Sequence, residues 1–372
     1  MSVTGLPLTI VAVDFDAAEA AGIRDPLRRA DLLGYLESEG FTLAEMVEAE
    51  RQGRLFALAG DAVIRSGPAR HSLRSTADVL GEPFDDVLHA WSALGLPIGE
   101  PDLLALSDFD IDALRTWVEV RNALGTETAL GLMRVLGASM ARLAEAESSA
   151  IRGTVPDVQL EYTADEARTA KAFAAMGQLV PRIGQLMDAV HRQHIQSART
   201  YFEQVVYDTT SEVMVGVGFA DLSGFTALTE RLSLGQLSNV LTTFGSTASD
   251  VVHAYDGRVV KLLGDAVMWV NVDAGHLAEV ALSLVRHPIA QHAGMQVRAG
   301  LAYGPTLALD GDYFGSAVNL AARLVANAEP GQILASRAVS EQLTGWTATE
   351  LEPVTLRGFD EPVTPYSIQP NG

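Results

Sequence analysis

Residues 217–226 read VGFADLSGFT and residues 259–270 read VVKLLGDAVMWV. Each stretch is an apolar run that carries an aspartate near a glycine, Asp221 in the first and Asp265 in the second. Apolar runs of this kind predict buried strands. An unpaired carboxylate in such a setting costs several kcal/mol or takes up a proton. A shared metal is one way to keep both aspartates ionised, so the two stretches predict a metal site where their strands approach each other.

Composition limits the classes of partner. The chain has 372 residues and a formal net charge of −21, which opposes non-specific binding to nucleic acid and to anionic membranes. It has no cysteine, so disulfides, thiolate metal sites and thiol nucleophiles are excluded. No apolar run reaches the roughly 20 residues of a membrane span, and the N-terminus lacks a basic signal-peptide start. We therefore expect a cytoplasmic protein with neither a nucleic-acid partner nor an integral membrane association.

The hydrophobic pattern changes along the chain. Residues 1–160 show apolar positions at helical spacing and predict an all-α domain, which we interpret as regulatory and inhibitory. Residues 161–208 predict a helical connector that Pro181 should kink. Residues 209–372 alternate strands and helices in a βαββαβ order, with a hairpin that turns at Gly264-Asp265, strands at 295–303 and 306–310 on either side of Gly304-Pro305, and a helix over 316–328. This order predicts a ferredoxin-like catalytic domain of the α+β class.

One segment of the N-terminal half has the pattern of a helix-turn-helix, from Leu73 to Trp91. The second helix would read DNA, but it carries Asp85 and Asp86 and no basic residue, so it should repel phosphate. We interpret the segment as a packing unit, with a transcription regulator as the weaker alternative.

The residues after Asp221 suggest an anion site. They are expected to begin a helix, whose free backbone N–H groups would bind a triphosphate. A glycine among them would let the backbone approach the phosphates closely. The expected contacts are Leu222, Ser223, Gly224, Phe225 and Thr226.

Three sequence words together resemble the catalytic domain of class III nucleotide cyclases. They are FADLSGFT at 219–226, KLLGD at 261–265, and DYFG at 312–315 followed by VNLAAR at 318–323. The words follow the order and spacing of that family over residues 212–368. The resemblance implies that Asp221 and Asp265 bind two Mg²⁺ or Mn²⁺ ions per active site.

The resemblance also implies the substrate. Lys261 matches the lysine that donates to the purine ring, and Asp312 matches its partner that accepts from the adenine amino group. Guanylyl cyclases usually carry a glutamate and a small residue at these places, so the pair indicates ATP. Asn319 matches the residue that orients the ribose, and Arg323 matches the arginine that stabilises the transition-state phosphate. Arg357 corresponds to a basic residue for the triphosphate.

In this family the metal-binding aspartates come from one subunit and the purine-binding and transition-state residues from the other. The resemblance therefore implies a homodimer with two equivalent sites that converts ATP to cyclic AMP and pyrophosphate. The N-terminal half resembles the helical regulatory domain that precedes actinobacterial adenylate cyclases, which implies inhibition of the catalytic half. An apolar ligand, or pH acting through His191 and His194, are candidate signals.

Two alternatives stay open. The domain could be a catalytically silent cyclase-like module that binds nucleotide and only signals. It could also be a related nucleotidyl-transferring enzyme, although the Gly-Gly-acidic-acidic-Phe word of diguanylate cyclases is absent.

Overall fold

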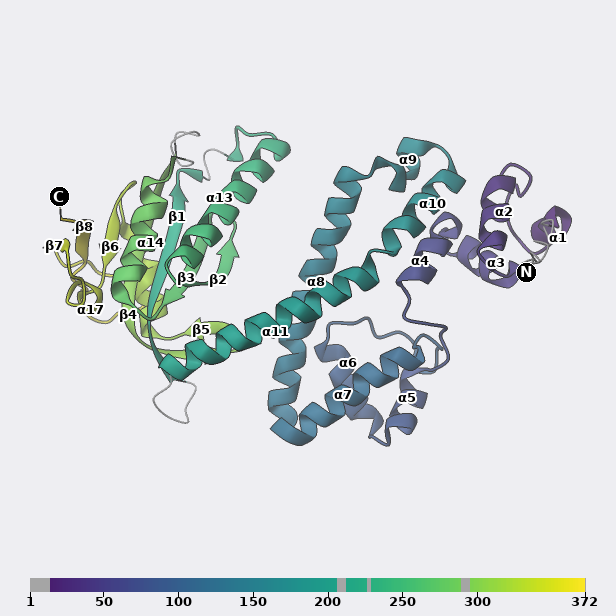
Figure 1. The fold of residues 1–372 in the computed structure, drawn as a ribbon, viewed down its shortest axis with the longest axis horizontal. Helices are drawn as coiled ribbons and strands as arrows, with labels where there is room; N and C mark the ends of the chain where they lie inside the picture. The colour runs from purple at the N-terminus through teal and green to yellow at the C-terminus, as the bar shows by residue number, and fades with distance from the viewer. Residues whose placement is uncertain (1–13, 206–211, 226–228, 289–294, 372) are drawn as a thin grey trace, which may run out of the picture. The chain divides into compact units, whose positions relative to one another are not determined.

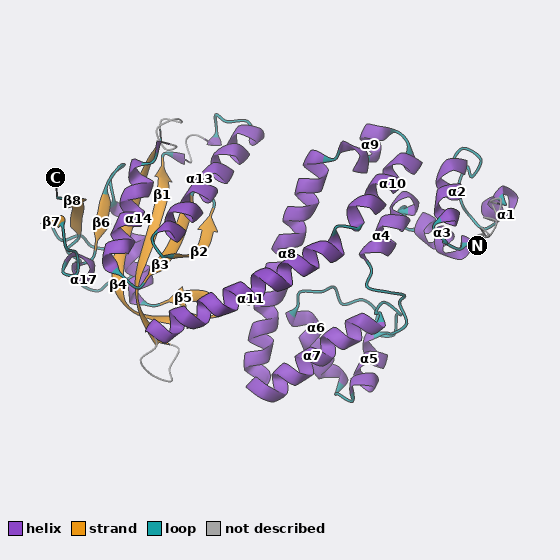
Figure 2. Ribbon diagram, in the orientation of Figure 1, coloured by secondary structure: helices purple, strands orange, loops and turns teal. Residues whose placement is uncertain are grey.

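The computed structural model describes residues 14–205, 212–225, 229–288 and 295–371, without the side chains of residues 201–205. The chain divides into two compact units, Met1–His194 and Ile195–Gly372, drawn in Figures 1 and 2. One helix, α11 (Val180–Val205), runs across the division.

The described part of the first unit is built from helices joined by loops (Figure 2). Their bounds are α1 Phe15–Ala20, α2 Ala30–Ser38, α3 Leu43–Arg51, η1 Leu55–Ala57, α4 Leu58–Ile64, α5 Leu73–Leu80, α6 Phe84–Ala93, α7 Asp108–Leu124, α8 Thr126–Thr154, η2 Pro156–Val158, α9 Leu160–Thr163 and α10 Glu166–Gly177. This confirms the all-α class predicted for the N-terminal half.

Two separate cores hold these helices. One is formed by α1 to α4 with α10, and the other by α5 to α8. The predicted helix-turn-helix is α5 and α6, which turn at Gly81 in the left-handed conformation and bury Ala77, Val87 and Ala90 in the second core. Both helices thus have an apolar packing partner inside the unit, as the packing interpretation predicts.

A partly buried ion-pair network joins the helices of the first core. Arg29, before α2, donates to Glu50 of α3 at 2.8 Å and also pairs with Glu166 of α10. Burial opposes ionisation of Glu50, but the hydrogen bonds from Arg29 and Arg24 outweigh it and lower the pKa of Glu50. Losing one partner would leave a buried charge unpaired, so this network fixes the packing of three helices.

The expected kink at Pro181 is wrong. The chain breaks earlier, at residues 178–179, and Pro181 occupies the second position of α11. Proline fits the first turn of a helix, because the N–H that it lacks would have no helical acceptor there. Pro181 therefore helps to begin a helix.

The second unit is an α+β domain with one mixed sheet, in agreement with the ferredoxin-like prediction. Its strands are β1 Glu212–Ser223, β2 Arg258–Leu263, β3 Ala266–Asn271, β4 Gln296–Leu309, β5 Asp312–Phe314, β6 Ile333–Ala335, β7 Trp346–Glu350 and β8 Tyr366–Pro370. Helices α13 Leu234–Ala254, α14 Ala274–Arg286, α16 Ser316–Asn327 and α17 Arg337–Ser340 belong to the described part of this unit.

The strand order is β2-β3-β1-β4-β6-β8-β7, and β5 pairs with β4. Helices α13, α14 and α17 pack on one face of the sheet and α16 on the other; Figure 1 shows α13 and α14 in front of β1. Successive side chains of a strand point to opposite faces. In β1, Ala220 accordingly joins the core under α13 and α14, whereas Val217 and Phe219 join the core under α16.

Two local predictions fail in this unit. Residues 295–303 and 306–310 were expected to form two strands broken at Gly304-Pro305, but they form the continuous strand β4. Leu222 and Ser223 were expected to begin a helix, but they end β1, because the pairing of β1 with β4 continues to Ser223 opposite Gln296. Long-range pairing overrides the local preference in both cases.

Gly300 of β4 is where the sheet and α16 approach most closely. A Cβ on Gly300 would lie 2.2 Å from the backbone N of Val325 and 2.4 Å from the carbonyl O of Ala321. Both atoms belong to α16, whose backbone cannot move away without losing its packing on the sheet. Gly300 thus sets the distance between α16 and β4.

We predict that Gly300→Ala lowers the free energy of unfolding of the second unit by about 2 kcal/mol and displaces α16. Gly304→Ala is the matched control on the same strand, since its Cβ would meet the Cβ of Ala317 at an ordinary 3.6 Å. Urea unfolding monitored by tryptophan fluorescence measures both. Equal stability of the two variants would contradict the close approach.

Candidate functional site

The two aspartates meet at one end of the sheet. Asp221 lies near the end of β1, opposite Ala266 of β3, and Asp265 lies in the turn between β2 and β3. The backbone N–H of Leu222 donates to the carbonyl O of Asp265 at 3.1 Å. Gly264 permits the turn with a φ of 66°. The hairpin predicted from sequence is confirmed, and it brings the two carboxylates to the same edge.

A third charged residue, Arg298, completes this cluster and was not singled out from the sequence. It lies on β4 directly opposite Asp221. Its Nε donates to Asp221 Oδ1 at 2.7 Å and its Nη2 donates to Asp221 Oδ2 at 3.0 Å. An arginine inside an otherwise apolar strand was the available signal, because a half-buried guanidinium requires an anionic partner.

Two carboxylates and one guanidinium meet at this end of the sheet. Burial raises the pKa of the Asp265 carboxyl, and the negative charge of Asp221 raises it further, while Arg298 acts in the opposite direction. The hydrogen bonds that Arg298 donates to the Asp221 carboxylate raise the pKa of Arg298. One guanidinium therefore compensates two carboxylates only in part, and the site favours additional positive charge.

Lys261 and Asp312 form an ion pair between β2 and β5. Strand β5 was not predicted, and it exists because residues 312–314 fold back on β4, with Leu309 opposite Asp312. A cavity of about 400 Å³ lies beside the pair. Its lining comes from the start of β2, from the turn between β4 and β5, and from Ala198.

Helix α16 carries the next two predicted residues. Asn319 and Arg323 lie one turn apart, and both are exposed, while Ala317, Ala321 and Leu324 form the buried side of the helix. The Nε of Arg323 donates to the carbonyl O of Arg357 at 3.2 Å. Arg357, whose correspondence rested on the resemblance alone, therefore lies next to Arg323.

The expected phosphate loop is described only in part. Leu222 is buried in the sheet core, and the Ser223 hydroxyl donates to the carbonyl O of Gln296. Gly224 adopts a φ of 82° and Phe225 is helical. Thr226 lies outside the described residues. The side chains of Leu222 and Ser223 thus face other partners within the domain.

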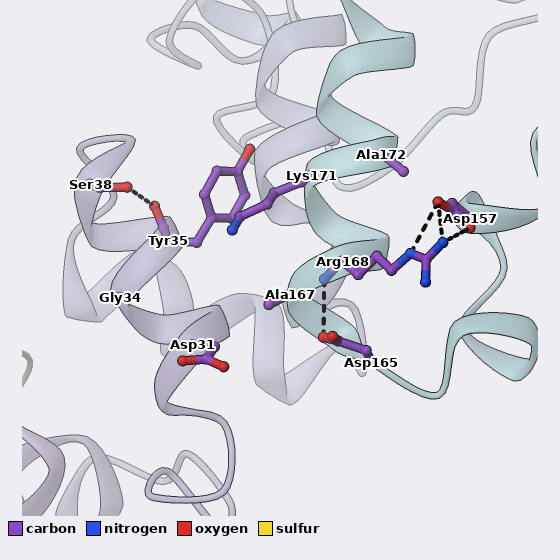
Figure 3. A pocket seen from close by; sticks show the side chains of 10 residues that line it. All are labelled: Asp31, Gly34, Tyr35, Ser38, Asp157, Asp165, Ala167, Arg168, Lys171 and Ala172. Carbon is purple, nitrogen blue, oxygen red and sulfur yellow. Dashed lines mark hydrogen bonds and ion pairs between the residues drawn. The ribbon is translucent and has the colours of Figure 1, made fainter.

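The first unit has a cavity of its own, of about 720 Å³, between α2 and α10 (Figure 3). Arg168 pairs with Asp157, and the Nζ of Lys171 lies 5.4 Å from the centre of the Tyr35 ring. None of the predicted catalytic residues belongs to this cavity. His191 and His194 are exposed on α11 and do not line it.

Two family models match the chain. Residues 207–370 match the adenylate and guanylate cyclase catalytic domain, and residues 20–198 match the adenylate cyclase regulatory domain. With the fold above, these matches define the chain as a class III nucleotide cyclase with its own regulatory domain.

Similar proteins indicate which kind of nucleotide cyclase this chain resembles. An adenylate cyclase of Streptomyces coelicolor is 32% identical and covers 77% of this chain and 75% of its own. A pH-sensitive adenylate cyclase of Mycobacterium tuberculosis is 28% identical over 92% of this chain and 88% of its own. An uncharacterised protein of the same species is 55% identical over 97% and 95%. The adenylyl cyclase CyaB of Pseudomonas aeruginosa, a solved structure, has 25% identity and a TM-score of 0.40 over 43% of this chain and 96% of its own. The chain belongs to the adenylate cyclase family.

Cyclase catalytic domains use divalent metal ions, and the residues of this chain fit such an ion. Asp221 and Asp265 offer hard carboxylate oxygens at one edge, where charge is only partly compensated. Each oxygen that accepts from Arg298 keeps a second lone pair. Within the described residues no group of three or more His, Cys, Asp or Glu side chains could hold a metal. A cation on two carboxylates would keep substrate oxygens and water in the rest of its shell.

Among the described residues, no helix is both long and apolar enough to cross a bilayer.

We predict that Asp265→Asn raises the Tm of the metal-free protein by about 2 °C. A raised pKa means that the folded state prefers the protonated carboxyl, so the ionised form costs stability at pH 7 and the neutral amide removes that cost. The difference from wild type should shrink as the pH falls toward the raised pKa of Asp265. Differential scanning calorimetry in EDTA measures it, and a lower Tm at pH 7 would contradict the charge excess.

Proposed function

We propose that this adenylate cyclase converts ATP to 3′,5′-cyclic AMP and pyrophosphate at two equivalent sites shared between the subunits of a homodimer. The observation that carries the proposal is the pair of charge clusters in one domain. Asp221, Asp265 and Arg298 cluster at the sheet edge, and Lys261 pairs with Asp312 between β2 and β5. A cation-binding cluster and an adenine-reading pair are the two halves that this reaction requires.

Substrate selection would depend on Lys261 and Asp312. The ammonium group can donate to a ring nitrogen of adenine, and the carboxylate can accept from the exocyclic amino group. In the free protein the ammonium group of Lys261 donates a hydrogen bond to the Asp312 carboxylate. This ion pair would hold both side chains near the positions from which they bind adenine. Guanine presents the opposite pattern of donors and acceptors on this edge and would be disfavoured.

The cyclisation of ATP would depend on how the side chains and metal ions position the ribose and the phosphates and stabilise their charge. Asp221 and Asp265 would hold two Mg²⁺ or Mn²⁺ ions, which when bound supply Lewis-acid activation of the ribose 3′-hydroxyl and neutralisation of the phosphates. Asn319 would orient the ribose, and Arg323 would donate to the α-phosphate as its charge grows. The ribose 3′-hydroxyl loses its proton to water and its oxygen bonds to the α-phosphorus. The bond between the α-phosphorus and the oxygen that bridges to the β-phosphate breaks, and pyrophosphate leaves. Arg357, whose backbone carbonyl accepts from Arg323, would add a second guanidinium for the triphosphate.

The resemblance to class III cyclases supports shared sites. In that family one subunit supplies the metal-binding aspartates and the other supplies the purine-binding and transition-state residues. A chain that carries one complete set of residues then forms two sites across a two-fold axis. A monomer would be inactive, because neither half alone holds both the metals and the base.

We predict that an Asp221→Ala chain and an Arg323→Ala chain are each inactive alone and recover activity when mixed. Half of the dimers should be hybrids with one intact site each, so the mixture should reach about a quarter of wild-type activity. Cyclic AMP formed from MnATP after subunit exchange measures this recovery. Arg286→Ala, on the exposed end of α14, is the control that should stay active alone.

If the mixture stays inactive while native mass spectrometry shows hybrid dimers, the shared-site proposal is wrong. If all dimers, wild type included, form no product from ATP or GTP, the silent nucleotide-binding module is the better description.

Regulation would come from the first unit. Its match to an adenylate cyclase regulatory domain supports this role, and α11 provides a continuous helical connection from residue 180 to residue 205. We propose the domains 1–160, 161–208 and 209–372 as regulatory, connector and catalytic. A second cavity of about 480 Å³ in the first unit, lined by Phe56, Ile151, Phe173 and Met176 among others, is a candidate site for an apolar ligand.

We predict that removal of residues 1–200 raises activity roughly five- to tenfold, the usual size of a coupling free energy between domains. The measurement is the initial rate of cyclic AMP formation by equal concentrations of dimer. The same truncation with Asp221→Ala is the blank. A truncated dimer that is equally or less active would show that the first unit is not inhibitory.

A further inference from the structure

The guanidinium of Arg298 contacts two parts of the domain at once. On one side it holds both carboxylate oxygens of Asp221. On the other side its Nη1 donates to the carbonyl oxygens of Ala326 and Ala328, at 3.1 and 3.2 Å. The side chain is 26% exposed. Four of its five N–H groups can be assigned to these contacts.

The second contact lies at the C-terminal end of α16. The last carbonyl groups of a helix have no partner within it, and the end carries partial negative charge that a cation stabilises. Helix α16 has no basic residue in its own last turn. Arg298 supplies from β4 the cation that the helix lacks.

Helix α16 also carries Asn319 and Arg323 on its exposed side. The position of α16 along the sheet therefore determines where the side chains of Asn319 and Arg323 lie. Gly300, two residues after Arg298 on the same strand, fixes how closely the helix approaches. Arg298 fixes its end.

We infer that Arg298 is a positioning residue that couples the two active sites of the dimer. The inference rests on the proposed function, in which Asp221 serves one site while Asn319 and Arg323 of the same chain serve the other. One guanidinium then links the metal-binding carboxylate of the first site to the transition-state helix of the second. A change at either contact is transmitted through one rigid group of a few ångströms.

Hybrid dimers distinguish this role of Arg298 from any role in the active site that uses Asp221 and Asp265 of the same chain. In a dimer of an Arg323→Ala chain with an Asp265→Ala chain, one site survives. It takes its aspartates from the first chain and its α16 from the second. In the second chain the aspartate site is inactive, so Arg298 of that chain can reach the surviving site only through α16.

Adding Arg298→Gln to the Asp265→Ala chain should lower kcat of the surviving site about fivefold and change KM for ATP less than about twofold. Arg298→Lys keeps the charge without the planar fork and should recover part of kcat. Arg286→Gln, at the end of α14, is the matched control and should change neither. An unchanged kcat with Arg298→Gln overturns the coupling. An inactive parent hybrid contradicts the shared sites themselves.

Hydrogen exchange gives a second readout, on full-length homodimers without metal or nucleotide. Arg298→Gln should speed exchange of the backbone amides in residues 320–328 about tenfold, whereas Arg286→Gln should leave them unchanged. Unchanged exchange of the backbone amides of α13 and α14 in the same variant excludes general unfolding. Unchanged exchange in residues 320–328 would show that Arg298 does not hold the end of α16, and the inference would be wrong.

Discussion

The contact between Arg298 and Asp221 is the interaction on which the arrangement of the catalytic domain depends. Two carboxylates at the same edge of a sheet repel each other, and burial adds to the cost of their charge. Pairing one of them with a guanidinium lowers that cost and leaves the edge with an excess of negative charge. The edge is therefore stable enough to fold and still favours a cation. A site that binds metal reversibly needs both properties.

The same strands distribute the remaining residues. Asp265 ends the turn of a hairpin whose first strand carries Lys261, and β4 continues from Arg298 to the turn that brings Asp312 back to Lys261. Helix α16 packs on the opposite side from α13 and α14, held close by Gly300 and at its end by Arg298. Chemistry-bearing side chains thus lie on regular, packed elements, where a fixed geometry is easiest to maintain.

Sequence reasoning predicted what depends on local pattern and on motif words. The all-α and α+β classes, the hairpin at Gly264 and the helix from Ser316 were all evident from periodicity and turn residues. The continuous strand through Pro305 was not, because the pairing of β4 with residues far away in the chain decides it. The start of α11 near Pro181 could have been predicted from proline's preference for a first helical turn.

Arg298 was missed because its role depends on the register of β1 with β4, although a charged residue within an apolar strand was a usable signal. The Lys261–Asp312 pair was expected only from the family resemblance, and no spacing rule would have brought residues 51 positions apart together.

The central claim is that Asp221 and Asp265 form the metal platform of an adenylate cyclase. The most direct measurement is product analysis of the purified full-length chain with MnATP, next to Asp221→Asn. The account predicts cyclic AMP and pyrophosphate in equal amounts from the wild type, and a loss of about a thousandfold or more in the variant. Equal rates for both proteins, or pyrophosphate without cyclic AMP, would contradict it.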